Sequence, residues 1–301
     1  MAQRNHPCDD IVVACFPTEP GHFEKVGKEA FQRQLHHCML GQALQMKSTI
    51  EERRSRNELG HLVWQLNEIW PTGGWGSLEH GNPMFPGQVL GGRWKPLHCF
   101  YRASTFADVL ATCNGEGVGF IRNDAGGREF RGDAILNVIN IETGRTDDGQ
   151  VYKDIYLPQG PGSVKTFPCP KVDGSTQFMS IDVLSSDGTL ESRNSPLLFK
   201  PPKEISCVRC DSGLDLMIGG GESDGVVTIE ITTTAPVALF VVLTTAAHGR
   251  FSDNAFPTFG GWAVVEFHPF GELDLDLLRE TLRVEDMAMC HHGHCKTVES
   301  A

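Results

Sequence analysis

The sequence predicts a multidomain chain in which an α/β region precedes two all-β regions. Helical spacing of apolar residues is strong only before about residue 105, and short β-branched runs separated by Gly, Asp, Asn and Pro follow it. The Pro-rich step at residues 200–203 divides the β-rich part into two stretches of about 100 residues, the size of a β-sandwich. We therefore expect domains at residues 1–105, 106–202 and 203–301.

The composition is that of a globular protein with ample apolar material for its cores, because 40% of the 301 residues are hydrophobic and 21% are charged. The formal net charge of −12 argues against a nucleic-acid partner, which would require clustered Lys and Arg. No apolar run reaches about 18 residues, so no membrane-spanning helix is expected. The first residues also lack the pattern of a secretory signal peptide.

Apolar residues recur at helical spacing through residues 23–57, which predicts one long helix. These residues are Phe31, Leu35, Cys38, Met39, Ala43, Met46 and Ile50. The next stretch, His61–Leu66, is short and almost entirely apolar. Such a run is typical of a strand that is buried on both faces of a parallel sheet.

Pro and Gly residues predict a long loop over residues 67–93. A second helix is expected from Arg93 to Arg102, because a proline such as Pro96 suits the first helical turn. The apolar residues of this segment, Leu97, Phe100 and Tyr101, would share one face. The order of helix, buried strand, loop and helix is typical of an α/β fold.

The remaining chain reads as strands separated by turn residues. The first set is expected at residues 107–112, 117–121, 134–141, 151–157 and 178–184. The second set is expected at residues 214–218, 226–233, 237–243 and 262–268. The final stretch from Leu277 is expected to end in an acidic tail that contains His and Cys.

Ten cysteines lie along the chain without the even spacing of a disulfide-stapled domain. No glycosylation sequon accompanies them, which favours a reducing compartment or a protein that never meets the glycosylation machinery. Cys207 and Cys210, together with Cys290 and Cys295, could supply zinc ligands, but their combined spacing is irregular. We interpret them as a stray pair and a His-rich tail, and expect neither a metal site nor a cofactor.

Four of the five tryptophans fall between residues 64 and 95, among Asn, Gln and Glu residues. A long loop inside a compact fold is usually functional or disordered, and clustered Trp argues against disorder. Trp rings beside amides and carboxylates suit a sugar site, in which the rings stack on the C–H face. The alternative is that Trp64 and Trp70 fill a core and Trp94 packs a helix.

Three strings of residues in this region resemble a known family. They are Trp64–Pro71, Trp75–Glu79 and Gly92–His98, and together they are similar to the segment around the last barrel strand of β-mannosidases of glycoside hydrolase family two. Glu68 replaces the usual Asp, His80 replaces the usual Tyr, and a Gly/Pro-rich insertion covers residues 82–90. Far downstream, Gly249–Phe256 resembles a motif of the closing immunoglobulin-like domain of that family. The resemblance runs from about residue 31 to about residue 285.

The resemblance implies the C-terminal remnant of a (β/α)8 barrel followed by two immunoglobulin-like β-sandwiches. It implies that Trp64, Asn67 and Trp75 line the subsite for the terminal sugar. The residues that would support the loop are Gln65, Glu68, Trp70, Glu79, Arg93 and Trp94. Because glycosidase barrels of this clan often hold the last-strand Trp through a cis peptide bond, we also predict a cis bond between Trp64 and Gln65.

The complete enzyme that the resemblance implies would remove terminal non-reducing β-D-mannose with retention, from an oligosaccharide or a glycoprotein glycan. Its route would be lysosomal or secretory. The oligomeric state stays open.

A retaining glycosidase needs a carboxylate nucleophile and a carboxylic acid/base. The Ser-Glu-Phe/Tyr-Gly segment that carries the nucleophile in the family is absent from this sequence. Of two Asn-Glu pairs, Asn57-Glu58 is expected at a helix end on the surface, and Asn67-Glu68 belongs to the last-strand motif. We therefore expect no catalytic residue, an inactive chain, and a fragment rather than a degenerate paralogue. The alternative function is a non-catalytic carbohydrate-binding or interaction module.

Overall fold

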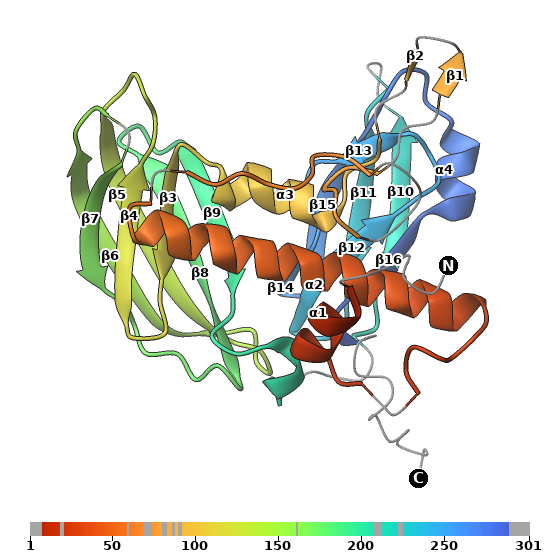
Figure 1. Ribbon diagram of the computed structural model, residues 1–301, viewed down its shortest axis with the longest axis horizontal. Coiled ribbons are helices and arrows are strands. Elements are labelled where there is room, and N and C mark those ends of the chain that lie inside the picture. Colours follow the sequence, from red (N-terminus) through yellow and green to blue (C-terminus); the bar gives the residue numbers. More distant parts are fainter. Residues whose placement is uncertain are drawn as a thin grey trace.

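The long helix α2 (Lys28–Ser55) organises the computed structural model, and it runs across two β-sheet units (Figure 1). The structure describes residues 8–18, 21–58, 60–68, 74–79, 83–85, 88–89, 92–160, 162–206, 212–221 and 225–288. At about 1.5 Å per residue, the 28 residues of α2 span roughly 42 Å. The predicted long helix is confirmed, although it begins at Lys28 because a turn occupies residues 21–24.

Two further helices pack on α2. Helix α1 (Cys8–Cys15) is joined to it by the Cys8–Cys38 disulfide, and α3 (Pro96–Phe100) continues as a π-helical turn, η1 (Tyr101–Thr105). The predicted helix around Pro96 is confirmed, since Leu97, Phe100 and Tyr101 are all buried. No helix among the described residues is both long and apolar enough to cross a membrane.

The first β unit contains two antiparallel sheets. One has the order β3-β4-β7 and the other the order β6-β5-β8-β9. Their bounds are β3 (Val109–Cys113), β4 (Val118–Asn123), β5 (Phe130–Asn140), β6 (Thr146–Leu157), β7 (Ser163–Pro168), β8 (Gln177–Ser185) and β9 (Leu190–Leu197). Val109 and Ile121 of one sheet share an apolar core with Leu136 and Ile181 of the other. The two sheets therefore pack face to face.

The second β unit is one sheet with the order β10-β11-β15-β14-β12-β16, in which β13 also pairs with β15. Its bounds are β10 (Asp215–Gly221), β11 (Val227–Thr232), β12 (Val237–Thr244), β13 (Gly249–Phe251), β14 (Phe256–Phe259), β15 (Trp262–Pro269) and β16 (Arg283–Glu285). Helix α4 (Leu275–Thr281) lies beside it, and the Asp274 carboxylate caps the helix by accepting from Leu277 N. A short 3₁₀ turn, η2 (Pro202–Glu204), separates the two units at the predicted Pro-rich step.

Helix α2 is fixed to the first β unit by a buried polar network. Lys47 Nζ donates to Glu51 Oε1 at 2.7 Å and to Asn194 Oδ1 at 2.5 Å. Thr112 Oγ1 donates to the other Glu51 carboxylate oxygen at 3.2 Å. Every member has a partner, which is the condition under which a buried polar network gives a single packed arrangement.

The prediction of a buried strand at His61–Leu66 is wrong. Residues 60–66 have no regular structure, and Leu62 and Leu66 are 99% and 61% exposed. The apolar run was expected to be covered by neighbouring strands of a parallel sheet, and no described segment pairs with it in that way. In the described part of this region, β1 (Pro83–Phe85) and β2 (Gln88–Val89) form a hairpin, and Leu78 forms isolated β-bridges with Asn67 and Trp94.

Four of the described cysteines form two disulfide bonds. Besides Cys8–Cys38, the structure contains a disulfide between Cys113 and Cys169, which joins the end of β3 to the residue after β7. Disulfides form and persist in oxidising compartments, so these bonds contradict the expected reducing compartment. The four cysteines considered as zinc ligands lie outside the described residues.

Candidate functional site

Trp64 and Trp75 line the same small cavity, about 100 Å³ in volume. Its other walls come from α1, from α2 and from the loop, namely Cys8, Ile11, Cys38, Gln42, Gln45, Met46 and Gly74. None of these side chains carries a charge. The cavity can therefore contact apolar or neutral polar groups, and its two Trp rings remain 74% and 45% exposed.

A buried ion pair holds the loop that carries Trp75. Glu68 and Lys95 are each about 1% exposed, and Lys95 Nζ donates to Glu68 Oε1. The same carboxylate oxygen accepts from Gly76 N at 2.9 Å. Desolvation lowers the pKa of Lys95, and the hydrogen bond and charge of Glu68 oppose that lowering. Glu68 is thus committed to positioning the loop and is not exposed to the cavity.

Backbone hydrogen bonds join two segments of this region, residues 66–68 and 77–78. Leu66 O accepts from both Ser77 N and Leu78 N at 3.0 Å, and Glu68 N donates to Leu78 O. The approach is close at Gly76, where a Cβ would lie 2.6 Å from the backbone of Asn67 and Glu68. A side chain at this position would push the segments apart, which explains the glycine.

The loop is also tied to the second β unit. Arg93 Nε donates to Glu79 Oε2 and Arg93 Nη1 to Thr245 O, each at 2.5 Å. The Trp94 ring lies between His98, at a centroid distance of 4.4 Å, and the Arg250 guanidinium, 5.0 Å from the ring centroid. Arg250 belongs to the downstream motif at residues 249–256, so the two motifs that carried the resemblance meet in space.

The structure brings together some of the predicted site residues and not others. Trp64 and Trp75 share the cavity, whereas Asn67 is exposed, does not line it, and donates through Nδ2 to Glu68 O. Gln65 is half-buried, and the predicted cis bond between Trp64 and Gln65 is confirmed. Trp70 and His80 lie outside the described residues.

Sequence reasoning missed Gln42, which lines the cavity and is 6% exposed. A signal was present, since Cys38, Gln42 and Met46 recur every four residues and so share one face of the predicted helix. Glu58, from the first Asn-Glu pair, lies at the surface in an ion pair with Arg53, as expected. Its neighbour Asn57 accepts from Arg122 Nη1 at 3.0 Å.

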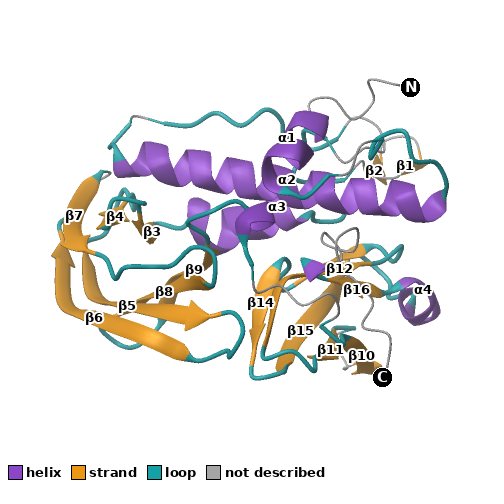
Figure 2. Cartoon of the chain, turned by 90° about the horizontal axis from the view of Figure 1, so that it is seen from below, coloured by secondary structure: helices purple, strands orange, loops and turns teal. Residues whose placement is uncertain are grey.

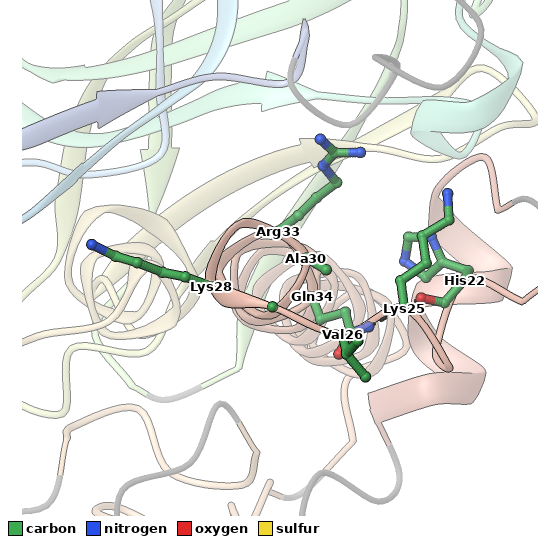
Figure 3. A pocket seen from close by; sticks show the side chains of 8 residues that line it. His22, Lys25, Val26, Lys28, Ala30, Arg33 and Gln34 are labelled. Carbon is green, nitrogen blue, oxygen red and sulfur yellow. Dashed lines mark hydrogen bonds between the residues drawn. The ribbon is translucent and has the colours of Figure 1, made fainter.

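A larger hollow, about 550 Å³, lies at the N-terminal end of α2 and contains none of the predicted site residues. It is lined by His22, Lys25, Val26, Gly27, Lys28, Ala30, Arg33 and Gln34. Figure 3 shows that Lys25, Lys28 and Arg33 point in different directions. The charged groups do not converge on one point, so this hollow offers no defined anion site.

Comparison with known proteins first defines the class of fold. The family of mannosidase Ig-fold domains matches residues 216–290, which include strands β11 to β16. The chain is thus mostly β-sheet and contains an Ig-like domain.

The relatives are more specific. The chain is 27% identical to a β-mannosidase of Capra hircus over 284 residues, which cover 86% of this chain and 30% of that protein. The β-mannosidase of Bos taurus is 26% identical over the same shares, and that of Mus musculus is 42% identical over 65 residues, 19% of this chain and 6% of that protein. The resemblance to the C-terminal portion of family-two β-mannosidases is confirmed, and the chain spans about 30% of the length of the first two relatives.

Solved structures agree on the fold. A β-D-mannosidase from Dictyoglomus thermophilum superposes with a TM-score of 0.63 at 18% identity, over 91% of this chain and 31% of that chain. An exo-chitosanase from Amycolatopsis orientalis gives a TM-score of 0.58 at 14% identity, over 84% and 33%. Both likenesses extend well beyond the Ig-fold domain.

Proposed function

We propose that this chain is the C-terminal portion of a β-mannosidase-like glycoside hydrolase. The complete enzyme hydrolyses terminal non-reducing β-D-mannose residues of an oligosaccharide or glycoprotein glycan, with retention. The observation that carries the proposal is the cavity shared by Trp64 and Trp75. Trp rings offer the apolar faces on which sugar C–H groups stack, and the curated relatives are β-mannosidases.

The proposal includes a domain organisation. Residues 1–105 form the C-terminal part of a (β/α)8 barrel, residues 106–202 an immunoglobulin-like sandwich, and residues 203–301 the closing immunoglobulin-like domain with its tail. The order of α2, loop and α3 supports the first assignment, and the two face-packed antiparallel sheets support the second. A lysosomal or secretory route agrees with the two disulfides.

The chain's own residues bind and position the sugar, and the two catalytic carboxylates lie elsewhere in the complete enzyme. In this proposal Trp64 and Trp75 contact the sugar, Asn67 borders the subsite, and Gln65, Glu68, Trp70, Glu79, Arg93 and Trp94 support the loop. Glu68 is paired with Lys95, and Glu79 is paired with Arg93. In this proposal both carboxylates hold the loop, and neither serves as the nucleophile or the acid/base of a retaining mechanism.

A non-catalytic carbohydrate-binding module is the second candidate. The exposure of the two Trp rings favours it, because they can meet a sugar without a surrounding barrel. In this case the β-sandwiches and the loop act together as a binding surface.

Turnover of a chromogenic aryl β-mannoside tests both functions, with the purified wild type beside Glu68→Gln and Glu79→Gln. We expect no turnover above the uncatalysed rate in any of the three, and turnover once an upstream barrel region of a relative is joined to the chain. Sugar binding with no activity in the joined protein would favour the binding module. Wild-type turnover that disappears in either variant would overturn the assignment of these carboxylates.

A further inference from the structure

Helix α1 precedes the sequence motifs that carry the resemblance to the β-mannosidases, and it packs closely on α2. It lies on the side of α2 that faces away from the sheets (Figure 2). Val12 of α1, and Phe16 directly after the helix, are each 1% exposed. The two helices cross at Gly41, where a Cβ would lie 2.7 Å from Ile11 Cγ2. The Cys8–Cys38 disulfide fastens the crossing.

Helix α1 also forms one wall of the candidate sugar cavity. Cys8 and Ile11 line it opposite the residues of α2 and the loop. The resulting volume of about 100 Å³ is well below the roughly 300–1,000 Å³ of pockets that enclose organic ligands. While α1 is docked, a pyranose ring does not fit between this helix and the two Trp rings.

One residue that lines the cavity, Gln42, has a hydrogen-bond acceptor without a donor in the described part of the chain. Gln42 is 6% exposed and its Nε2 makes one long bond, 3.4 Å, to Gly76 O. Its Oε1 is buried and has no hydrogen-bond partner among the described residues. Buried amide oxygens normally have a donor. A ligand hydroxyl entering the cavity would supply it, and the uncharged lining favours a neutral sugar over a charged ligand.

We propose, on the basis of the function above, that the Cys8–Cys38 disulfide is a redox latch on this cavity and that Gln42 Oε1 accepts a sugar hydroxyl when the latch opens. A dithiol reductant transfers two electrons and two protons to the bond. The S–S bond breaks, two cysteine thiols form, and the reductant becomes a disulfide. Both sulfur-bearing residues line the cavity but are only 4% and 2% exposed, so the reductant reaches the bond when α1 opens transiently.

Release of α1 follows from its length. It has eight residues, fewer than the roughly 12–15 at which an isolated helix becomes even marginally stable in water. Without the covalent bond, α1 is held by the burial of Val12 and Phe16, by the stacking of Phe16 on His37, and by one hydrogen bond from Lys203 Nζ to Val13 O. When it leaves, Cys8 and Ile11 no longer wall the cavity, and a pyranose ring can reach Trp64, Trp75 and Gln42.

Titration of the full chain with methyl β-D-mannoside, followed by Trp fluorescence, tests the latch. We expect at least tenfold tighter binding after treatment with dithiothreitol, and in a Cys8→Ser/Cys38→Ser variant without reductant. A Cys113→Ser/Cys169→Ser variant, which lacks the other disulfide, should bind as the oxidised wild type does. Gln42→Leu in the reduced protein should lose about tenfold in affinity. Equal affinity of the oxidised and reduced wild type would overturn the latch.

Hydrogen exchange of residues 8–16, measured without sugar, separates this proposal from the proposed function. Faster exchange on reduction supports the release of α1 even if no form binds the mannoside, and that result would overturn the sugar site alone. Unchanged exchange together with tight binding to the oxidised protein would overturn the latch and leave the sugar site standing.

Discussion

The sheet of the second β unit and the loop segments between residues 60 and 95 are both rich in apolar residues, yet they bury them to opposite degrees. In the sheet, Ile229 and Phe267 are completely buried. In the loop, Leu62 and Trp64 are 99% and 74% exposed. The difference lies in the partners, because β11 and β15 each pair along their length with neighbouring strands. Within the described chain, backbone hydrogen bonding of the loop begins only at Leu66.

The two regions are therefore stabilised by different kinds of interaction. The sheet relies on an apolar core that includes residues from β11, β12 and β15. The loop relies on a polar contact, the buried Glu68–Lys95 pair, together with a few backbone hydrogen bonds. A core distributes stability over many residues, whereas the loop depends on a few polar contacts, of which the Glu68–Lys95 pair is completely buried. Substitutions in the two regions should therefore have distinct signatures.

The largest effect is expected from Phe267→Ala in the sheet. Removing a completely buried Phe leaves a cavity and should lower the free energy of unfolding by about 3–5 kcal/mol. Leu62→Ala is the matched control, and because Leu62 is exposed it should change stability by less than about 0.5 kcal/mol. Urea unfolding followed by circular dichroism measures both. Similar losses in the two variants would remove the distinction between the regions.

The next largest effect is expected from Lys95→Met in the loop. It leaves the Glu68 carboxylate buried with Gly76 N as its remaining donor, and breaking a buried pair in this way costs about 3 kcal/mol. The loss of stability should be confined to the loop. In a urea titration, Trp fluorescence should therefore change at a lower urea concentration than the circular dichroism of the sheets does. Adding Glu68→Gln removes the stranded charge and should restore most of the stability. If Lys95→Met alone were as stable as the wild type, the Glu68–Lys95 pair would not be what holds the loop.

The elements that could be predicted from sequence are those whose partners are nearby in the chain or whose pattern is regular. Helix α2 and strands β5, β8 and β11 have clear periodicity, and the alternating burial of β5 follows the two-residue period of a strand. Strand β12 is instead a continuous apolar run that is buried along almost its whole length. Strands β7 and β9 were missed because Lys, Pro, Arg and Asn interrupt their apolar pattern. The three-residue strands β13 and β16 are too short to show a period.

The candidate site was predictable only where a motif carried it. The motif led to Trp64, Trp75 and the cis bond, and all three appear in the structure at one place. It did not lead to Gln42 or α1, because neither belongs to the motif and the contacts of α1 with the cavity span some thirty to sixty residues of sequence. The strand prediction failed at residues 61–66 because burial depends on neighbours, which a local apolar run does not specify.

The smallest effect is expected at Asp253, where the second β unit meets α3 and β9. Desolvation by these elements raises the pKa of Asp253 to about 6, against the opposing effects of Asn254 N–H, Arg193 and Arg102. Because the folded-state pKa is raised, the folded protein binds this proton more tightly than the unfolded chain does. Asp253 therefore favours the fold below about pH 4, and this contribution is lost as the pH rises through 6.

The Asp253 residue is exposed to solvent, so the change should be only about 1 kcal/mol. Asp253→Asn does not titrate and keeps an oxygen that can accept from Asn254 N, as the wild-type side chain does at 2.8 Å. The difference in unfolding free energy between wild type and variant, measured in urea at pH 4, 5, 6 and 7, should move by that amount against the wild type as the pH rises. A difference that is flat, or that moves in favour of the wild type, would mean that the junction with α3 and β9 does not desolvate this carboxylate. The contact between the β unit and the helices would then be as open to water as the loop.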